Sequence, residues 1–268
     1  MTDNLNPPSL LYKFCGYDAL KLILQNGTFR ANPPESENDP QECMPAGVDC
    51  DGAMSFVTND KAIRDSIRNS LRHLNLPCDE ASVNSWHQDI LSDVSKGIVA
   101  ARTPQEWREA IITNVAFVSF SEHANSEYMW KEYGENHGGA RLTVNTSNIR
   151  NIFKVLYRPQ PVVLNPDYPK NSSSLSNLVL DWLTRKISNG RWENEAEWRI
   201  ICPILERRFD SNNNAFTLIH FNPNALVEIQ LGYNAPCDAE EAVQCLLKKY
   251  PHVELSREER VTSPGENA

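Results

Sequence analysis

The chain has 268 residues, enough to bury a sizeable core, and we expect one domain over residues 1–268. It has no apolar run of membrane-spanning length, and its formal net charge of −9 opposes generic nucleic-acid binding, because neutralising phosphates needs clustered Lys and Arg. We expect no secretory signal at the polar N-terminus, and the seven scattered cysteines show no zinc-binding spacing. We therefore expect a soluble cytoplasmic protein that has no structural metal and no membrane partner.

The first elements predicted are a strand over residues 10–14 and a helix over 17–25 that ends at Asn26-Gly27. Residues 31–51 predict a long loop, and residues 59–112 predict two or three amphipathic helices that form a helical insertion. The later elements follow in this order: a strand over 115–121, a helix over 126–136 ended by Gly138-Gly139, strands over 140–144 and 153–157, a helix over 175–188 ended by Asn189-Gly190, strands over 195–202, 216–221 and 227–231, a helix over 239–250 and a strand over 253–255. Residues 263–268 predict a disordered tail. This order of elements predicts the α+β class.

The main candidate site is the run Trp192-x-x-Glu195-x-Glu197-x-Arg199. Alternate side chains of a strand share a face, so Glu195, Glu197 and Arg199 would point one way and apolar residues the other. One interpretation is a solvated sheet face on which Arg199 offsets two carboxylates. The other is a binding site, because two carboxylates about 7 Å apart can hold one small polar ligand, as sugar or ribose chemistry requires.

A second group of residues precedes this run. Trp130, Tyr133 and His137 have the i, i+3, i+7 spacing of one helical stripe, which is typical of a core but also fits a stacking wall for a planar ring. Ser119 and Ser121 share a face of their strand, where they are either polar filler or groups that orient a ribose.

Tyr12 and Lys13 lie on the first predicted strand, with Lys13 facing away from Tyr12. A lysine on an edge strand usually has no special role. The run Asn38-Asp39-Pro40 predicts a structural turn.

Together these segments resemble a microbial family, domain of unknown function 2971. The resemblance spans most of the chain in order, except for residues 59–112, and this sequence departs from the family pattern at Cys15, Glu37 and Gln41. The matching residues are Leu11-Tyr12-Lys13-Phe14, Asn38-Asp39-Pro40, Phe120-Ser121-Glu122, Met129-Trp130-x-x-Tyr133-x-x-x-His137-x-Gly139, Lys186, the Trp192 to Arg199 run, and Ile229-x-Leu231-Gly232.

A looser resemblance is to the ADP-ribosyltransferase plan of a basic residue, a Ser-x-Ser strand and a Glu-x-Glu strand. It implies a mixed, mostly antiparallel split sheet flanked by helices. It also implies NAD as the substrate, an unknown macromolecular acceptor, and a setting in bacterial phage defence or toxin action. By this analogy Glu197 steadies the oxocarbenium and Glu195 is the general base. The residues implied to hold NAD are Tyr12, Lys13, Ser119, Ser121, Trp130, Tyr133, His137 and Arg199.

Two other classes of function stay open. In a metal-dependent nuclease or hydrolase, Asp39, Glu42, Glu195 and Glu197 would collect magnesium, and Lys186 would assist. In a regulatory module, the same face would bind a nucleotide or a protein without chemistry.

Overall fold

The computed structural model describes residues 6–36, 43, 47–48, 64, 68, 78–85, 87–88, 115–149, 151–158, 163–164, 183–188, 190–204 and 206–260. The Asn38-Asp39-Pro40 turn, most of the 59–112 insertion and the 263–268 tail therefore lie outside the described residues. Of the insertion, residues 80–85 are helical, as expected. No helix in the described ranges is long and apolar enough to cross a membrane.

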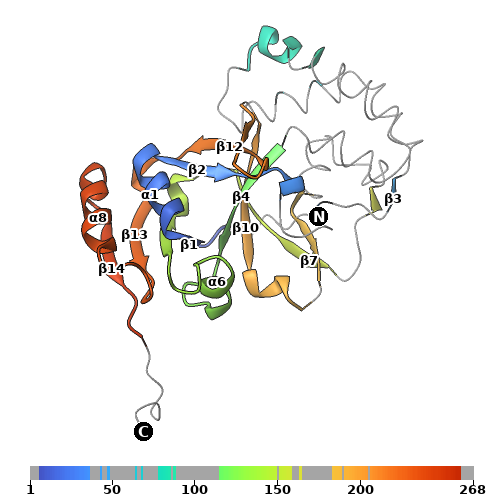
Figure 1. The fold of residues 1–268 in the computed structure, drawn as a ribbon. Helices are drawn as coiled ribbons and strands as arrows, with labels where there is room; N and C mark the ends of the chain where they lie inside the picture. The colour runs from blue at the N-terminus through green and yellow to red at the C-terminus, as the bar shows by residue number, and fades with distance from the viewer. Residues whose placement is uncertain are drawn as a thin grey trace.

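Seven strands form the main sheet in the order β14-β13-β5-β1-β4-β10-β6 (Figure 1). The elements are β1 (Leu10–Cys15), α1 (Tyr17–Asn26), β2 (Thr28–Ala31), η1 (Pro34–Ser36), β3 (Gly47–Val48), β4 (Val115–Ser121), α6 (Glu127–Glu132), β5 (Ala140–Asn145), η2 (Thr146–Asn148), β6 (Ile152–Lys154), β7 (Leu156–Arg158), β8 (Val163–Leu164), β9 (Arg185–Ile187), η3 (Trp192–Glu195), β10 (Glu197–Pro203), β11 (Arg208–Phe209), β12 (Ala215–His220), η4 (Pro223–Ala225), β13 (Leu226–Leu231), α8 (Ala239–Leu246), η5 (Leu247–Lys249) and β14 (Glu254–Arg257).

Every neighbouring pair in the main sheet is antiparallel except β13 and β14, which run parallel. The predicted α+β class with a mixed, mostly antiparallel sheet is thus confirmed. The strands β1 and β4 meet at a single residue pair, Tyr12 with Ser121, whereas β4 pairs with β10 over seven residues. The sheet therefore has its loosest junction on one side of β4, and β10, which carries Glu197, lies on the other side of β4.

The opening strand, helix and turn form as the sequence predicts. Leu20, Ile23 and Leu24 make the buried face of α1, as their spacing requires. Gly27 ends the helix in the left-handed conformation, with φ 64°, and its N–H donates to the Ile23 carbonyl. Glycine adopts this conformation without steric cost, so the chain can turn directly into β2.

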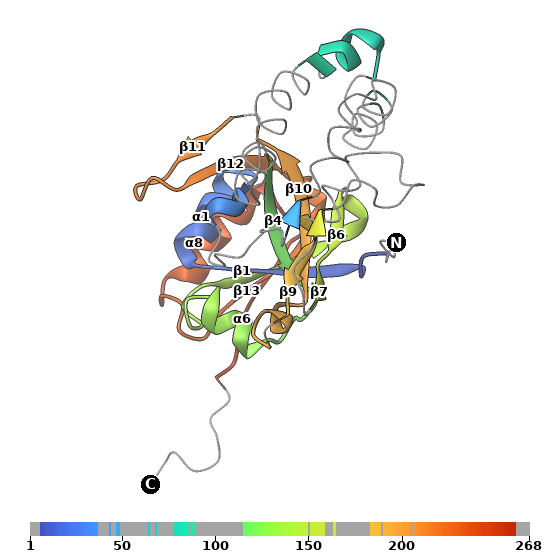
Figure 2. The same cartoon turned by 90° about the vertical axis from the view of Figure 1, so that its right-hand side faces the viewer.

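The core lies on one face of the main sheet. Alternate residues of each strand, such as Val118, Phe120 and Trp198, point to this face and pack with apolar residues of α1, β2 and α8. Figure 2 shows α1 and α8 on the same side of the sheet. The opposite face of β4 and β10 carries Ser119, Glu197 and Arg199 instead, so polar and charged side chains are collected on this face.

Several predicted elements have different bounds in the structure. The helix expected over 126–136 ends at Glu132, because Glu135, Asn136 and His137 adopt left-handed backbone conformations. The strand expected over 153–157 is divided at Val155, whose N–H donates to the Glu197 carbonyl at 2.9 Å. The helix expected over 239–250 finishes with the 3-10 turn η5.

The prediction of a helix over 175–188 is wrong for its C-terminal part, because residues 185–187 form the strand β9. This strand pairs in parallel with β7, and the Leu156 N–H donates to the Thr184 carbonyl at 2.7 Å. Pairing with a distant strand outweighs the local helical preference. Residues 175–182 lie outside the described part of the chain.

The expected strand over 195–202 begins later than predicted. Trp192–Glu195 form the 3-10 helix η3, and Ala196 takes a left-handed conformation with φ 41° before β10 starts at Glu197. Such a conformation is uncommon for a residue with a Cβ atom, and it is often found at functional sites. The two glutamates therefore do not lie on one straight strand.

Candidate functional site

The candidate site lies where β10 pairs with β4, on the face opposite the core. The register sets Glu197 against Ser121 and Arg199 against Ser119. The period of two in β10 thus places Glu197 and Arg199 on one side, as expected. Both are almost fully buried, at 3% and 0% exposure, so the interpretation of a solvated charged face is wrong.

Glu197 is held by donors from three strands. Arg199 binds both of its carboxylate oxygens, through Nε at 2.7 Å and Nη2 at 3.0 Å. The Ser119 hydroxyl donates to Oε1 at 2.5 Å, and Lys186 Nζ donates to Oε2 at 3.2 Å. The Glu197 backbone N–H donates to the Tyr157 hydroxyl at 3.2 Å. This carboxylate is therefore fixed in position and orientation.

Glu195 reaches the same cluster from η3. Its Oε2 accepts from Lys186 Nζ at 2.8 Å, and its Oε1 accepts from the Tyr133 hydroxyl at 2.5 Å. Lys186 therefore bridges the two carboxylates, and its ammonium also lies 4.6 Å from the centre of the Trp192 ring. Tyr133 is the C-cap residue of α6, so this contact joins the helix to the site.

The two carboxylates have pKa values shifted in opposite directions. Burial raises the pKa of Glu195, and the negative charge of Glu197 adds to the effect against the opposing pull of Lys186. Burial also opposes ionisation of Glu197, but Arg199 and Lys186 outweigh it and lower its pKa to about 2. Such divergence is typical of an acid–base pair, in which one group stays ionised and the other exchanges protons.

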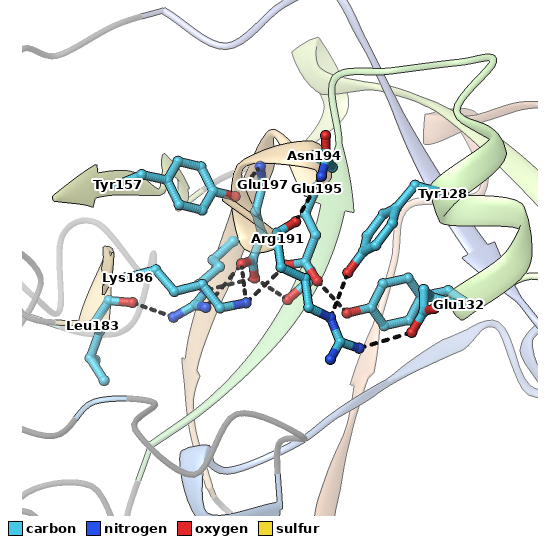
Figure 3. A network of polar contacts seen from close by, with 12 residues as sticks. Tyr128, Glu132, Tyr157, Leu183, Lys186, Arg191, Asn194, Glu195 and Glu197 are labelled. Carbon is cyan, nitrogen blue, oxygen red and sulfur yellow. Dashed lines mark hydrogen bonds and ion pairs between the residues drawn. The ribbon is translucent and has the colours of Figure 1, made fainter. Parts of the chain in front are cut away.

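Arg191 lies over the outer side of this cluster. Its guanidinium stands 4.7 Å from the centre of the Trp192 ring and donates to the Tyr128 hydroxyl and to Glu132. Figure 3 shows Arg191 in front of Glu195, with Tyr128 and Glu132 on one side and Tyr157 and Lys186 on the other. The buried carboxylates thus have an outer layer that contains aromatic rings and a cation.

Trp130 and His137 lie in a neighbouring cluster and do not form the expected helical stripe with Tyr133. Trp130 is 2% exposed and packs edge-on against Phe14, with ring centres 5.2 Å apart. His137 lies beyond the end of α6 and stacks between Trp130 and Tyr233. The Trp130 ring is therefore part of the protein interior, and only Tyr133 of the three contacts the carboxylates.

Lys13 lies on the other face of the sheet from Glu197. Its neighbours at alternate positions, Leu11 and Cys15, belong to the core, and its ammonium is 5.9 Å from the ring centre of the core residue Phe120. It donates to the Ser119 backbone carbonyl at 3.2 Å. The structure thus separates the basic residue of the ADP-ribosyltransferase analogy from the two glutamates.

Tyr12 and Ser121 are on the same face as Glu197. Tyr12 pairs with Ser121 across β1 and β4, and Ser121 pairs with Glu197. The Ser121 hydroxyl accepts the N–H of His123, so it shapes the turn after β4. Of the two serines, Ser119 contacts the carboxylate directly.

The sequence pattern predicts a helix at Lys186 and a role for this residue only in the nuclease alternative. Its contact with both glutamates depends on the pairing of β9 with β7, which no local pattern revealed. Tyr157 and Arg191 were not identified as site residues. The only signal for Lys186 was its place in the resemblance to domain of unknown function 2971.

Only two of the four carboxylates of the magnesium site in the nuclease alternative belong to the described residues. Asp39 and Glu42 lie outside the described residues, and Glu195 and Glu197 are paired with Lys186 and Arg199. Among the described residues, no group of three or more His, Cys, Asp or Glu side chains is arranged to hold a metal ion.

Comparison of the whole chain with family models, with curated proteins and with solved structures finds no match.

Proposed function

We propose that this chain is an ADP-ribosyltransferase-like enzyme that consumes NAD and transfers ADP-ribose to a macromolecular acceptor. The observation that carries the proposal is the contact between Ser119 and Glu197, with Glu195 linked to the same site through Lys186. The analogy drawn from the sequence requires a serine strand beside a Glu-x-Glu segment. The antiparallel pairing of β4 with β10 supports it, since it joins residues 78 positions apart in the chain.

The proposed reaction breaks the bond between nicotinamide and C1′ of its ribose. The bonding electron pair leaves with nicotinamide, and positive charge develops on the ribose. A nucleophile of the acceptor then forms a bond to C1′ and gives up its proton to Glu195. The pyridinium ring of NAD loses its positive charge when nicotinamide leaves, and the acceptor releases one proton. The total charge is therefore the same before and after the transfer.

The environments of the two carboxylates suit these two roles. Glu197 stays ionised because Arg199 and Lys186 surround it, so its fixed negative charge can stabilise positive charge in the transition state. Glu195 has a raised pKa, which brings it closer to the range in which a general base works. The Tyr133 hydroxyl orients Glu195 from the end of α6.

The outer layer of the site has groups suited to a dinucleotide. The guanidinium of Arg191 is more than half exposed and can hold a phosphate, and the Tyr128 ring lies beside it. Trp192 is buried and supports Arg191 through its ring. The free thiols of the six described cysteines support our proposal of a cytoplasmic setting, where NAD is available.

A second candidate is a module that binds a nucleotide or a protein without chemistry. It is favoured by the completeness of the ion-pair network: all four oxygens of Glu195 and Glu197 have protein donors, and two cations balance the two carboxylates. A buried network of this kind can serve mainly to specify the fold. In that case a nucleotide would bind and be recovered unchanged.

Transfer of label from radioactive NAD to protein, nucleic acid or water tests the proposed function. We expect turnover by the wild type and a loss of at least about 100-fold in Glu197→Gln, because a fixed charge next to the reacting carbon is removed. Glu240→Gln, at an exposed glutamate paired with Arg257, is the matched control and should keep full activity.

Folding of each variant is checked by its melting temperature and near-ultraviolet circular dichroism. Turnover that survives in a folded Glu197→Gln variant would contradict the proposed role of this residue. Absence of turnover by the wild type with every acceptor, together with recovery of intact bound nucleotide, would instead establish the binding module.

A further inference from the structure

A row of polar side chains crosses five strands of the main sheet on the face of the candidate site. The registers connect Glu228 of β13 to Thr143 of β5, Thr143 to Tyr12 of β1, Tyr12 to Ser121 of β4, and Ser121 to Glu197 of β10. Side chains paired across neighbouring strands lie on the same face. The site at Glu197 is therefore one end of a polar row that extends beyond the β1–β4 junction.

Arg141 is the basic residue next to the far end of this row. It is on β5 between Ala140 and Leu142, which both face the core, so its own side chain lies on the face of the site. Its guanidinium stands 5.2 Å from the centre of the Tyr12 ring. Arg141 thus lies on the sheet face of the candidate site. A site shared with Glu197 would need Lys13 on this face, but Lys13 is on the core face.

The guanidinium of Arg141 is buried but incompletely paired. Its Nη2 donates to Glu228 at 2.9 Å, and its Nη1 donates to the Ala124 carbonyl at 3.0 Å and to Asn125 at 3.3 Å. Arg141 is 6% exposed, and within the described residues its Nε has no hydrogen-bond partner. A buried donor without an acceptor is costly, so it calls for a specific explanation.

We propose that Arg141 binds the phosphate oxygens of a ligand that lies along the polar row. A guanidinium presents its donors in a planar fork that fits phosphate, and Nε is part of that fork. Glu228 is the residue that an anionic ligand would have to displace, and its side chain is 29% exposed. We place the entry of the ligand between β13 and the turn at residues 122–126. This turn contains Ala124 and Asn125, which accept hydrogen bonds from Nη1 of Arg141.

The position of Arg141 also constrains the size of the ligand. Three strand-to-strand steps separate β5 from β10, which amounts to about 14 Å. A ligand that contacts both Arg141 and Glu197 must therefore be elongated. This proposal rests on the proposed function for the nucleotide part of the ligand, whereas phosphate recognition follows from Arg141 alone.

Titration calorimetry of the full chain with inorganic pyrophosphate and, separately, with ADP-ribose tests the proposal. We expect both to bind the wild type and Arg141→Gln to bind each at least about ten-fold more weakly. Glu228→Gln should bind each several-fold more tightly, because it removes the competing carboxylate. Arg30→Gln, at an exposed arginine paired with Asp210, is the control and should bind like the wild type.

The opposite effects of the two variants separate ligand binding from a structural role. If Arg141 and Glu228 only stabilised the fold, both substitutions would lower the melting temperature and neither would tighten binding. Equal affinity of wild type and Arg141→Gln would overturn the proposal, as would absence of binding to the wild type. Loss of binding in Lys13→Gln with full binding in Arg141→Gln would also overturn it.

Binding and NAD turnover, measured on the same protein samples, distinguish the source of the ligand and test the proposed function separately. Tighter binding of ADP-ribose than of pyrophosphate would support a nucleotide, and the reverse order would support a free phosphate compound at the same site. Pyrophosphate binding that depends on Arg141 in a protein that never consumes NAD would support this inference while rejecting the enzyme. NAD turnover that is unchanged in Arg141→Gln would support the proposed enzyme and reject this inference.

Discussion

Glu195 and Glu197 are two residues apart but differ in what surrounds them. Arg199 binds both oxygens of Glu197, whereas Glu195 accepts from one lysine and one tyrosine. Removing one partner of such a buried pair leaves an uncompensated charge, which typically costs about 3–5 kcal/mol. We therefore expect substitutions in this cluster to affect both stability and function, and the two effects have to be measured separately.

The ionisation of Glu197 predicts a dependence of stability on pH. Its pKa in the folded protein is about 2, below the ordinary value of 4.5, so the unfolded chain takes up its proton more readily. The stability that it contributes is present above pH about 4.5 and is lost as the pH falls towards 2. The free energy of unfolding from urea titrations should fall less steeply over this range in Glu197→Gln.

Glu240→Gln is the control for that measurement and should retain the slope of the wild type. Glu195 acts in the opposite sense, because its raised pKa means that the folded protein holds this proton more tightly than the unfolded chain. Its contribution is lost as the pH rises through the folded pKa. An unchanged low-pH slope in Glu197→Gln would contradict the assignment of a lowered pKa to Glu197.

At the scale of elements, two glycines explain why the loop after α6 returns so close to the sheet. A Cβ atom at Gly139 would lie 2.1 Å from the Cys15 carbonyl oxygen, and one at Gly232 would lie 2.2 Å from the His137 carbonyl oxygen. The Gly232 N–H donates to the Gly139 carbonyl at 3.0 Å. These close approaches of backbone to backbone hold the loop in place and thereby position Tyr133.

Gly139→Ala is expected to destabilise the protein by about 1–3 kcal/mol, since backbone atoms rather than a flexible side chain must move. Gly190→Ala is the matched control: it meets no atom within 4 Å and adds only the strain of a left-handed backbone with φ 77°. Urea denaturation of the two variants measures the difference. A smaller loss in Gly139→Ala than in Gly190→Ala would show that the contact with Cys15 relaxes without cost.

At the scale of the whole molecule, the main sheet consists of two well-paired parts. One contains β14, β13, β5 and β1, and the other contains β4, β10 and β6, with a single pair between Tyr12 and Ser121. The polar row crosses this junction. The 2-stranded sheet of β7 and β9 brings Lys186 to the end of the row at Glu197. A ligand bound along the row would therefore connect the two parts.

Hydrogen exchange tests this arrangement. We expect ADP-ribose to slow the exchange of amides in β1 and β4 near Tyr12 and Ser121, because a bound ligand suppresses opening of the junction. Peptides from α8, which packs on the core face of the sheet, serve as the internal control. Protection that appears in α8 and not at the junction, under conditions where ADP-ribose binds, would place the ligand elsewhere.

The sequence by itself predicted the parts of the fold that depend on local pattern. The apolar spacing of α1, the glycine that ends it and the alternation of β4 and β10 each follow from a few neighbouring residues, and the class of the fold follows from their order. The cluster of Glu197 with Arg199 was predictable for the same reason. Two residues of one strand share a face in any sheet.

Only the tertiary structure decided which distant residues complete the site. Lys186 reaches the glutamates because β9 pairs with β7, Lys13 is excluded because β1 turns it to the core, and Arg141 faces the polar row because β5 lies beside β1. Strand order and register arise from contacts far apart in the chain, where the burial of apolar faces outweighs local preference. No window of the sequence contains that information.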